Sequence, residues 1–331
     1  MINDDEYFKL FECCQPVKGI SYSIIMDLQR DEYLKIPNLL NEVLKVNKKN
    51  NYSIKNLKSY FKNKLDSGID KYLKFLIEEE YGFMTNEPDK FPELNTDFIQ
   101  PNKVVSSVIN ITKNKRLPLY KIIKELDFLG CQTLQVRFFK DSFTEPFLKI
   151  IESFNRSSIR LIELYIEDSP NLEHKLLERI IKENLRVRII VFSSRKKNHL
   201  SRNNYQREVV YTEQNLYTTG KEIYSERLFT SNIQFFSEAK NFNVGLNKKI
   251  CIDENGNYKN YLSHKESFGN VNNISISEII KSKDFRKKWK IKNDLIEKCK
   301  DCQYRYMCLS NSDIKEEEGK FFKLNYCNYD L

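Results

Sequence analysis

The chain has 331 residues, of which 40% are hydrophobic, and its 55 basic and 46 acidic residues leave a formal net charge of +9. This size suffices for two or three domains, and the mixed charge is typical of a solvated lysine-rich surface. The sequence shows no signal segment and no apolar run long enough to cross a membrane. We therefore expect a cytoplasmic protein with reduced thiols and no membrane partner.

Residues 1–95 predict a small unit of strands followed by helices. Ile20–Asp27 is rich in β-forming residues, residues 28–31 indicate a turn, and Glu32–Ile36 predicts the second strand of a hairpin. Amphipathic helices are expected from Pro37-Asn38 onward, with Leu39, Leu40, Val43 and Leu44 on one face, and at 53–64 and 69–80. This order predicts a winged-helix-like module, and the turn-forming residues 86–92 predict a linker.

Residues 96–240 alternate strand and helix patterns. The predicted strands are Val104–Ile109, Cys131–Phe139, Ile159–Ile166, Val187–Phe192, Val209–Thr212 and Ile233–Phe236, and the predicted helices are 119–129, 145–154 and 173–183. Such alternation favours right-handed crossovers in a parallel sheet, so the unit is expected to be a partial (βα) barrel or an open parallel sheet. The overall class is thus α/β.

Residues 241–331 form the last predicted unit. A hairpin is expected around the turn Glu254–Gly256. Ser275 and Ser277 are candidate caps of a helix whose apolar face holds Ile279, Ile280, Phe285 and Trp289.

Four cysteines near the end of the chain indicate a metal centre. Cys299, Cys302 and Cys308 follow the spacing C-x2-C-x5-C, and Cys327 supplies a fourth thiol. Four thiolates suit either a [4Fe–4S] cluster or tetrahedral zinc. The spacing therefore predicts a metal site without deciding between the two.

The order of hairpin, Phe268-Gly-Asn-Val271, capped helix and cysteine tail resembles the SPASM domain of peptide-modifying radical SAM enzymes. The resemblance implies that the four tail cysteines hold an auxiliary [4Fe–4S] cluster. It also implies that a first auxiliary cluster is absent, because Tyr261 and Ser312 occupy two of its ligand positions and Cys251 lies too close to Gly256. We expect Cys251 to be a buried strand cysteine and His264 to lie in an exposed loop.

The cysteine count upstream argues against radical chemistry. Radical SAM enzymes hold their reactive cluster with C-x3-C-x2-C, but residues 15–250 contain one cysteine, Cys131. No bound S-adenosylmethionine is therefore expected.

The N-terminal segments Phe11–Gly19, Ile25–Arg30 and Ile36-Pro37, with the tail, resemble the SPASM-domain maturases of "grasp-with-spasm" systems. This resemblance implies an N-terminal peptide-recognition module, a precursor peptide and a partner ATP-grasp ligase. The candidate peptide-binding residues are Ile25, Asp27, Gln29 and Arg30, since an added peptide strand would follow the sheet edge.

The leading hypothesis is an accessory maturase in ribosomal-peptide modification that binds the precursor, the ligase or both. One alternative is a stand-alone metalloenzyme acting on peptides, although His174, His199 and His264 match no nucleophile pattern and no catalytic residue is assigned. The other is a zinc-containing nucleic-acid-binding regulator. Its candidate recognition helix, 53–64, has lysines but no arginine for reading bases, which argues against a nucleic-acid partner.

Overall fold

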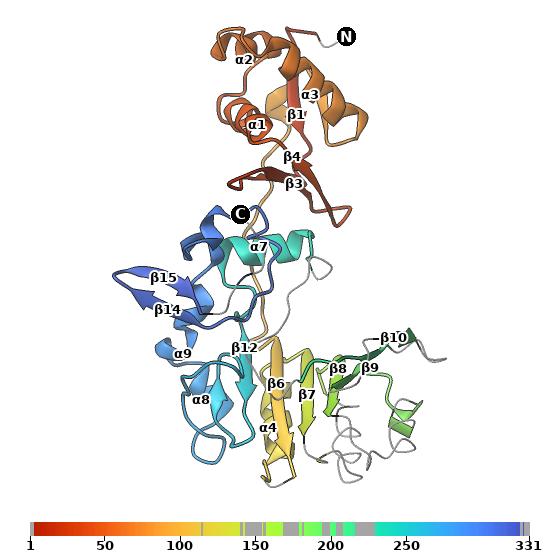
Figure 1. Cartoon of the computed structure of the whole chain (residues 1–331), viewed down its shortest axis with the longest axis vertical. Helices are drawn as coiled ribbons and strands as arrows, with labels where there is room; N and C mark the ends of the chain where they lie inside the picture. The colour runs from red at the N-terminus through yellow and green to blue at the C-terminus, as the bar shows by residue number, and fades with distance from the viewer. Residues whose placement is uncertain are drawn as a thin grey trace.

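A computed structural model describes most of the chain. It covers residues 3–113, 115–139, 142, 154, 157–167, 179–180, 182–193, 199–202, 208–215, 229–324 and 327. The N-terminal unit lies at one end, the large sheet at the other, and the cysteine tail with α7 lies between them (Figure 1). His174, most of the predicted helix 145–154 and most of the predicted helix 173–183 lie outside the described residues.

Two small sheets form the strand part of the N-terminal unit. Strands β2 (Cys14–Val17), β3 (Ser23–Asp27) and β4 (Glu32–Ile36) form an antiparallel sheet with β3 at its centre, while β1 (Tyr7–Leu10) pairs with β5 (Gly82–Thr85). The predicted hairpin of β3 and β4 with its turn at 28–31 is confirmed.

Three helices complete the N-terminal unit: α1 (Asn38–Asn50), α2 (Ile54–Tyr60) and α3 (Asp66–Glu78). They pack on one face of the strands through a core that includes Leu40, Leu57 and Leu73. Leu39, predicted to face this core, is instead 46% exposed, because α1 directs Leu40, Val43 and Leu44 inward. The linker contains the short helix η1 (Pro88–Lys90).

A large, mostly parallel sheet follows, in the order β10-β11-β9-β8-β7-β6-β12-β13. Its strands are β6 (Ser106–Thr112), β7 (Thr133–Phe139), β8 (Leu161–Glu167), β9 (Val187–Ser193), β10 (His199–Arg202), β11 (Glu208–Tyr211), β12 (Lys249–Ile252) and β13 (Tyr258–Lys259). The pairings from β12 through β11 are parallel, and β10 and β13 pair antiparallel at the two edges. The expected mixed α/β class with a parallel sheet is thus confirmed, and the sheet also contains strands from the predicted third unit.

Helix α4 (Leu119–Phe128) follows β6 and ends before Gly130, as predicted. Gly130 adopts a φ of 79°, which a glycine accepts without strain.

The prediction of a strand at Ile233–Phe236 is wrong, because this segment begins helix α7 (Ile233–Asn241). The Asn232 side chain accepts a hydrogen bond from the Phe235 N–H and caps the helix. Phe236 and Ala239 are then buried one helical turn apart.

The C-terminal segment consists of short elements around the cysteines. They are α8 (Ile276–Ile279), α9 (Lys283–Lys287), η4 (Lys288–Lys290), η5 (Asn293–Leu295), η6 (Cys299–Asp301), β14 (Ile314–Glu317) and β15 (Lys320–Lys323). Ser275 and Glu278 form a reciprocal capping box, and Ser282 caps a separate helix. The single helix expected through Trp289 is therefore divided into three short ones.

Among the described residues, no helix combines the length and the apolar character that crossing a bilayer requires.

Candidate metal centre

The first two cysteines lie on a tight turn. Lys298 adopts a left-handed φ of 68°, and the 3-10 turn η6 then carries Cys299 and leads to Cys302. The backbone N–H of Tyr304 points to the Cys302 sulfur at 3.4 Å. Such N–H donors stabilise a thiolate and adjust the potential of a cluster that it binds.

A hairpin returns the fourth cysteine to this turn. Glu318 and Gly319 both have positive φ, which suits the two-residue turn between β14 and β15. Phe321 on β15 pairs with Ile296, and its carbonyl accepts the Glu297 N–H. Cys327, whose carbonyl accepts from Lys298 Nζ, therefore lies beside the turn that carries Cys299.

Burial makes the two turn cysteines poor thiolates on their own. It raises the pKa of Cys299 above its usual value and raises the pKa of Cys302 to about 12, and the neighbouring tail thiols add to both shifts. Burial alone would lower the pKa of Lys323, but the Cys308 and Cys299 thiols beside it raise the pKa overall. A bound cation would supply the positive charge that these thiolates need.

The two candidate metal groups require different separations of the four thiols. Zinc bound at about 2.3 Å to each sulfur would place tetrahedral sulfurs about 3.8 Å apart. A four-iron cluster binds each thiolate through a different iron and so separates its ligands more widely.

The loop between Cys302 and Cys308, the metal loop, packs directly on the N-terminal sheet. Tyr304 and Met307 are buried against Val17, Ile24 and Met26, on the sheet face opposite the three helices. Phe236 of α7 joins the same cluster. The metal loop thus lies between the cysteine site and the N-terminal unit.

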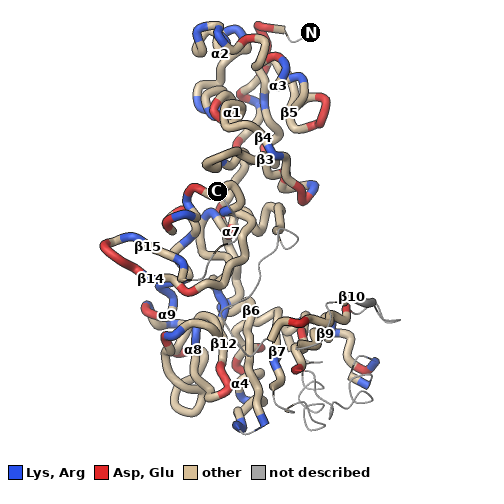
Figure 2. The backbone as a smooth tube through the Cα atoms, viewed as in Figure 1, with Lys and Arg blue, Asp and Glu red and all other residues tan. Residues whose placement is uncertain are grey.

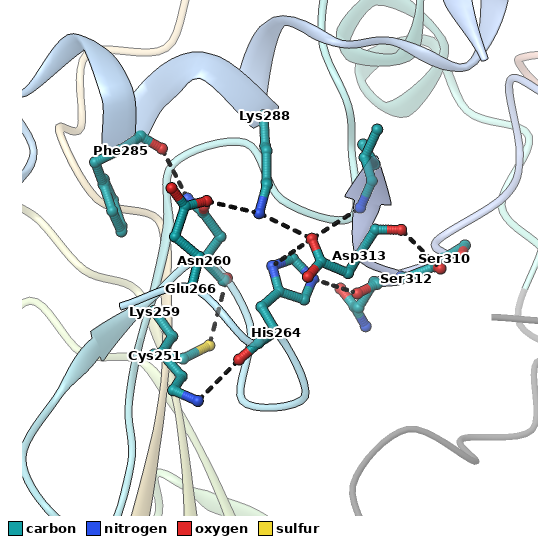
Figure 3. A network of polar contacts seen from close by, with 12 residues as sticks. Cys251, Lys259, Asn260, His264, Glu266, Phe285, Lys288, Ser310, Ser312 and Asp313 are labelled. Carbon is teal, nitrogen blue, oxygen red and sulfur yellow. Dashed lines mark hydrogen bonds and ion pairs between the residues drawn. The ribbon is translucent and has the colours of Figure 1, made fainter. Parts of the chain in front are cut away.

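The side chains at positions that the resemblance assigns to a first ligand set, and Cys251 near them, are hydrogen-bonded. The Tyr261 hydroxyl accepts from Arg137 Nη2 at 3.0 Å, and the Ser312 hydroxyl donates to the Asp313 carbonyl. The Cys251 thiol donates to the Asn260 carbonyl (Figure 3). Cys251 is fully buried in β12, as expected.

His264 is not exposed as predicted but only 1% exposed, because the segment after Cys308 covers it. Its Nε2 donates to the Asn311 carbonyl at 3.0 Å, and its Nδ1 lies 3.6 Å from the Asp313 carboxylate (Figure 3). Lys288 binds the same carboxylate at 2.8 Å. This ion-paired network joins the loop after β13, the 3-10 helix η4 and the chain before β14, and local sequence patterns gave no signal for it.

The predicted peptide-binding residues occupy two kinds of position. Ile25 and Asp27 lie on the central strand β3 and are buried, while Gln29 and Arg30 lie in the following turn. Asp27 accepts hydrogen bonds from both turn N–H groups at 2.9 Å and from Arg30 Nε at 2.6 Å. These bonds lower the pKa of Asp27 despite its burial.

Asp27, Gln29 and Arg30 line a cavity of about 460 Å³ together with Cys13 and Cys14. The two thiols and the Asp27 carboxylate lie within 4.8 Å of one another. The carboxylate is already saturated by N–H donors, and the Arg30 guanidinium beside it repels cations. The cluster therefore has a structural explanation, and peptide binding by these residues stays a prediction.

Strand β4, rather than β3, has an open edge. The bond from Leu28 N to Cys13 O fixes the alternation of the sheet, so that the main-chain groups of Tyr33 and Lys35 point away from β3. Neither residue's main-chain groups have a backbone partner among the described residues. Strand β2 forms the opposite edge of this sheet. It has no free outward N–H group for pairing, because Cys14 N already donates to Phe11 O and Pro16 has no N–H.

The candidate recognition helix for nucleic acid corresponds to the short helix α2 (Ile54–Tyr60). Its Lys58 is ion-paired within the protein. Its ammonium group is ion-paired with Asp4 at 2.7 Å and with Asp70 at 2.8 Å, and the residue is 8% exposed. It is thus not available to a phosphate.

Comparisons with known proteins give a family match that overlaps the start of the cysteine tail. Residues 248–303 match the SPASM family, an iron-sulfur cluster-binding domain. No curated protein matches the chain. The crystal structure of Streptococcus suis SuiB bound to S-adenosylmethionine aligns over 93% of this chain and 94% of that chain, with 10% identity and a TM-score of 0.40. The chain therefore contains a region of the SPASM iron-sulfur type, which includes Cys299 and Cys302 and ends before Cys308.

Proposed function

We propose that this chain is an accessory maturase in the modification of a ribosomally made peptide. In this proposal the N-terminal unit binds the precursor peptide, a partner ATP-grasp ligase, or both, while the four tail cysteines hold a [4Fe–4S] cluster. The observation that carries the proposal is the combination of a SPASM match at residues 248–303 with a single cysteine between residues 15 and 250. In this proposal, a SPASM region without the upstream three-thiolate set does not cleave S-adenosylmethionine.

The remaining upstream cysteine supports this ligand count. Cys131 is fully buried, and its thiol donates to the carbonyls of Val105 and Thr133. Burial raises its pKa to about 12, so it is a core residue rather than an available ligand.

The open edge of β4 supports peptide binding. Its outward N–H and C=O groups at Tyr33 and Lys35 can pair with an extended peptide, and main-chain pairing of this kind gives affinity without demanding one sequence. The ATP-grasp partner rests on the sequence resemblance alone.

Two measurements on the full chain test the proposal. Protein purified without oxygen should contain about four iron and four sulfide per chain, as a [4Fe–4S] cluster requires. It should also bind the precursor or the ligase encoded beside it, and the ligase should modify the precursor faster in its presence. Stoichiometric zinc without iron would contradict the proposed cluster. Failure to bind either partner would contradict the proposed maturase role.

A matched pair of variants tests the β4 edge. Lys35→Pro removes one outward N–H without breaking the pairing of β4 to β3, whereas Lys35→Ala removes the side chain alone. We expect the proline variant to lose precursor binding and the alanine variant to keep it. A folded proline variant that binds the precursor normally would exclude this edge.

A further inference from the structure

A second groove in the N-terminal unit lies away from β4, between the strands β1 and β2 and the helix α1. It has a volume of about 420 Å³. Its lining comprises Phe8 to Glu12, Cys14 to Pro16, Lys18, residues on one face of α1, and Arg305 of the metal loop. Nothing in the maturase proposal uses this groove.

One wall of the groove is a strand edge on which most main-chain groups have no partner in the part of the chain that the structure describes. The bond from Phe11 N to Tyr81 O fixes the alternation of the β1–β5 ribbon, so the main-chain groups of Phe8 and Leu10 point away from β5. Phe8 O accepts from the Asn47 side chain at 2.8 Å. The N–H groups of Phe8 and Leu10 and the Leu10 carbonyl have no backbone partner among the described residues.

The opposite wall supplies an unused buried acceptor. Asn47 on α1 is 7% exposed, and while its Nδ2 binds Phe8, its Oδ1 has no hydrogen-bond partner in the described part of the chain. A buried polar atom without a partner carries a free-energy cost that an arriving N–H donor would remove.

The groove is strongly basic. Lys9, Lys18, Lys45, Lys48 and Arg305 line it against one acidic residue, Glu12. Glu12 pairs with Lys48 at 3.2 Å and Arg305 pairs with Asp294, whereas Lys9, Lys18 and Lys45 have no acidic partner within the described ranges. Figure 2 shows basic positions along the backbone of α1 in blue.

We propose that this groove binds an extended acidic polypeptide segment, which adds as a strand to the free edge of β1. The main-chain donors and the acceptor of β1 select a polypeptide, and the three unpaired lysines select acidic side chains on it. The edge chemistry distinguishes this partner from a nucleic acid, which would offer charge but no strand to pair. The inference depends neither on the iron–sulfur site nor on the β4 edge.

The test uses fluorescence anisotropy of the full-length protein with a labelled short peptide in which Glu alternates with Thr and Val. Three further probes serve as comparisons: the same peptide with Lys in place of Glu, the acidic peptide with alternate main-chain nitrogens methylated, and a short DNA duplex. We expect the acidic peptide to bind, its affinity to fall with salt, and the lysine and N-methylated peptides to bind at least about tenfold more weakly. Equal binding of the N-methylated peptide, or tighter binding of the duplex, would show a general anion surface and overturn the proposal.

Matched variants on α1 locate the site. Lys45 lines the groove, whereas Lys49, on the same helix and also exposed, does not. We expect Lys45→Glu to weaken binding of the acidic peptide by about tenfold or more and Lys49→Glu by less than about twofold. Equal effects of the two changes would overturn the assignment. A Lys45→Glu protein that still binds the precursor would leave the maturase proposal untouched, and a wild-type protein that binds the acidic peptide but no precursor would leave this inference standing.

Discussion

The hydroxyl groups of Tyr22 and Tyr304 lie 2.8 Å apart although the two residues are 282 positions apart in the chain. Tyr22 precedes strand β3 of the N-terminal sheet, and Tyr304 lies between Cys302 and Cys308. Burial and the hydrogen bonds to Tyr22 and Tyr33 raise the pKa of Tyr304 far above its usual value, so the Tyr304 hydroxyl stays protonated at neutral pH. The contact therefore links the metal loop to the unit proposed to bind a peptide.

We predict that Tyr304→Phe weakens this link without disturbing the packing of the ring. Loss of the hydrogen bond should lower the free energy of unfolding by about 0.5–1.5 kcal/mol. Urea unfolding of Tyr22→Phe, Tyr304→Phe and the double variant measures the coupling directly. Strictly additive single effects would mean that the two hydroxyls do not interact in solution.

The metal prediction concerns Cys302. Cys302→Ser should abolish bound iron and destabilise the C-terminal segment, because metal binding free energy there is folding free energy. The matched control is Cys131→Ser, which changes a buried cysteine outside the site and should keep its iron while losing some stability. Iron analysis and thermal unfolding of both proteins check the prediction, and iron retained by Cys302→Ser would refute the site.

The buried histidine predicts a pH dependence. Burial lowers the pKa of His264 below 6.5, although Asp313 beside it opposes the shift. The unfolded chain therefore takes up a proton at higher pH than the folded chain does. The stabilising contribution is fully present above about pH 6.5 and is lost as the pH falls from there through the folded pKa.

His264→Gln tests this dependence, since its amide can still donate to the Asn311 carbonyl. We expect the variant to lose less stability than the wild type between about pH 7 and pH 5 in urea unfolding. His199, whose side chain is exposed, provides the control His199→Gln. Identical pH slopes for the wild type and His264→Gln would contradict the buried neutral histidine.

A pair of glycines gives opposite expectations for the same substitution. A Cβ on Gly245 would overlap the Ser310 carbonyl just beyond Cys308, whereas a Cβ on Gly68 in α3 would meet nothing within 4 Å. Gly245→Ala should lower the free energy of unfolding by about 1–3 kcal/mol. Gly68→Ala should raise it by about 0.5–1 kcal/mol, because alanine is the better helix former. Thermal or urea unfolding measures both stability changes. An unchanged free energy of unfolding for Gly245→Ala would show that the chain at Ser310 can move aside.

Local patterns in the sequence predicted most of the regular elements. The β3–β4 hairpin, α4 with its glycine stop and the β12–β13 hairpin around Gly256 all follow from residues close together in the chain. The strand prediction for Ile233–Phe236 was wrong because a short apolar run fits a strand and a helix equally well. In the structure, packing of Phe236 against Tyr306 favours the helix.

The sequence by itself also determined which thiols are available, since ligand count and spacing are properties of the chain. Only the tertiary structure decided where these thiols and their neighbours lie relative to one another. The return of Cys327 depends on the pairing of Ile296 with Phe321, the burial of His264 depends on Asn311, and the free edges at β1 and β4 depend on which strands pair. These contacts join residues that are distant in the chain, and their free energy comes from burial and pairing in the assembled fold, which local periodicity does not encode.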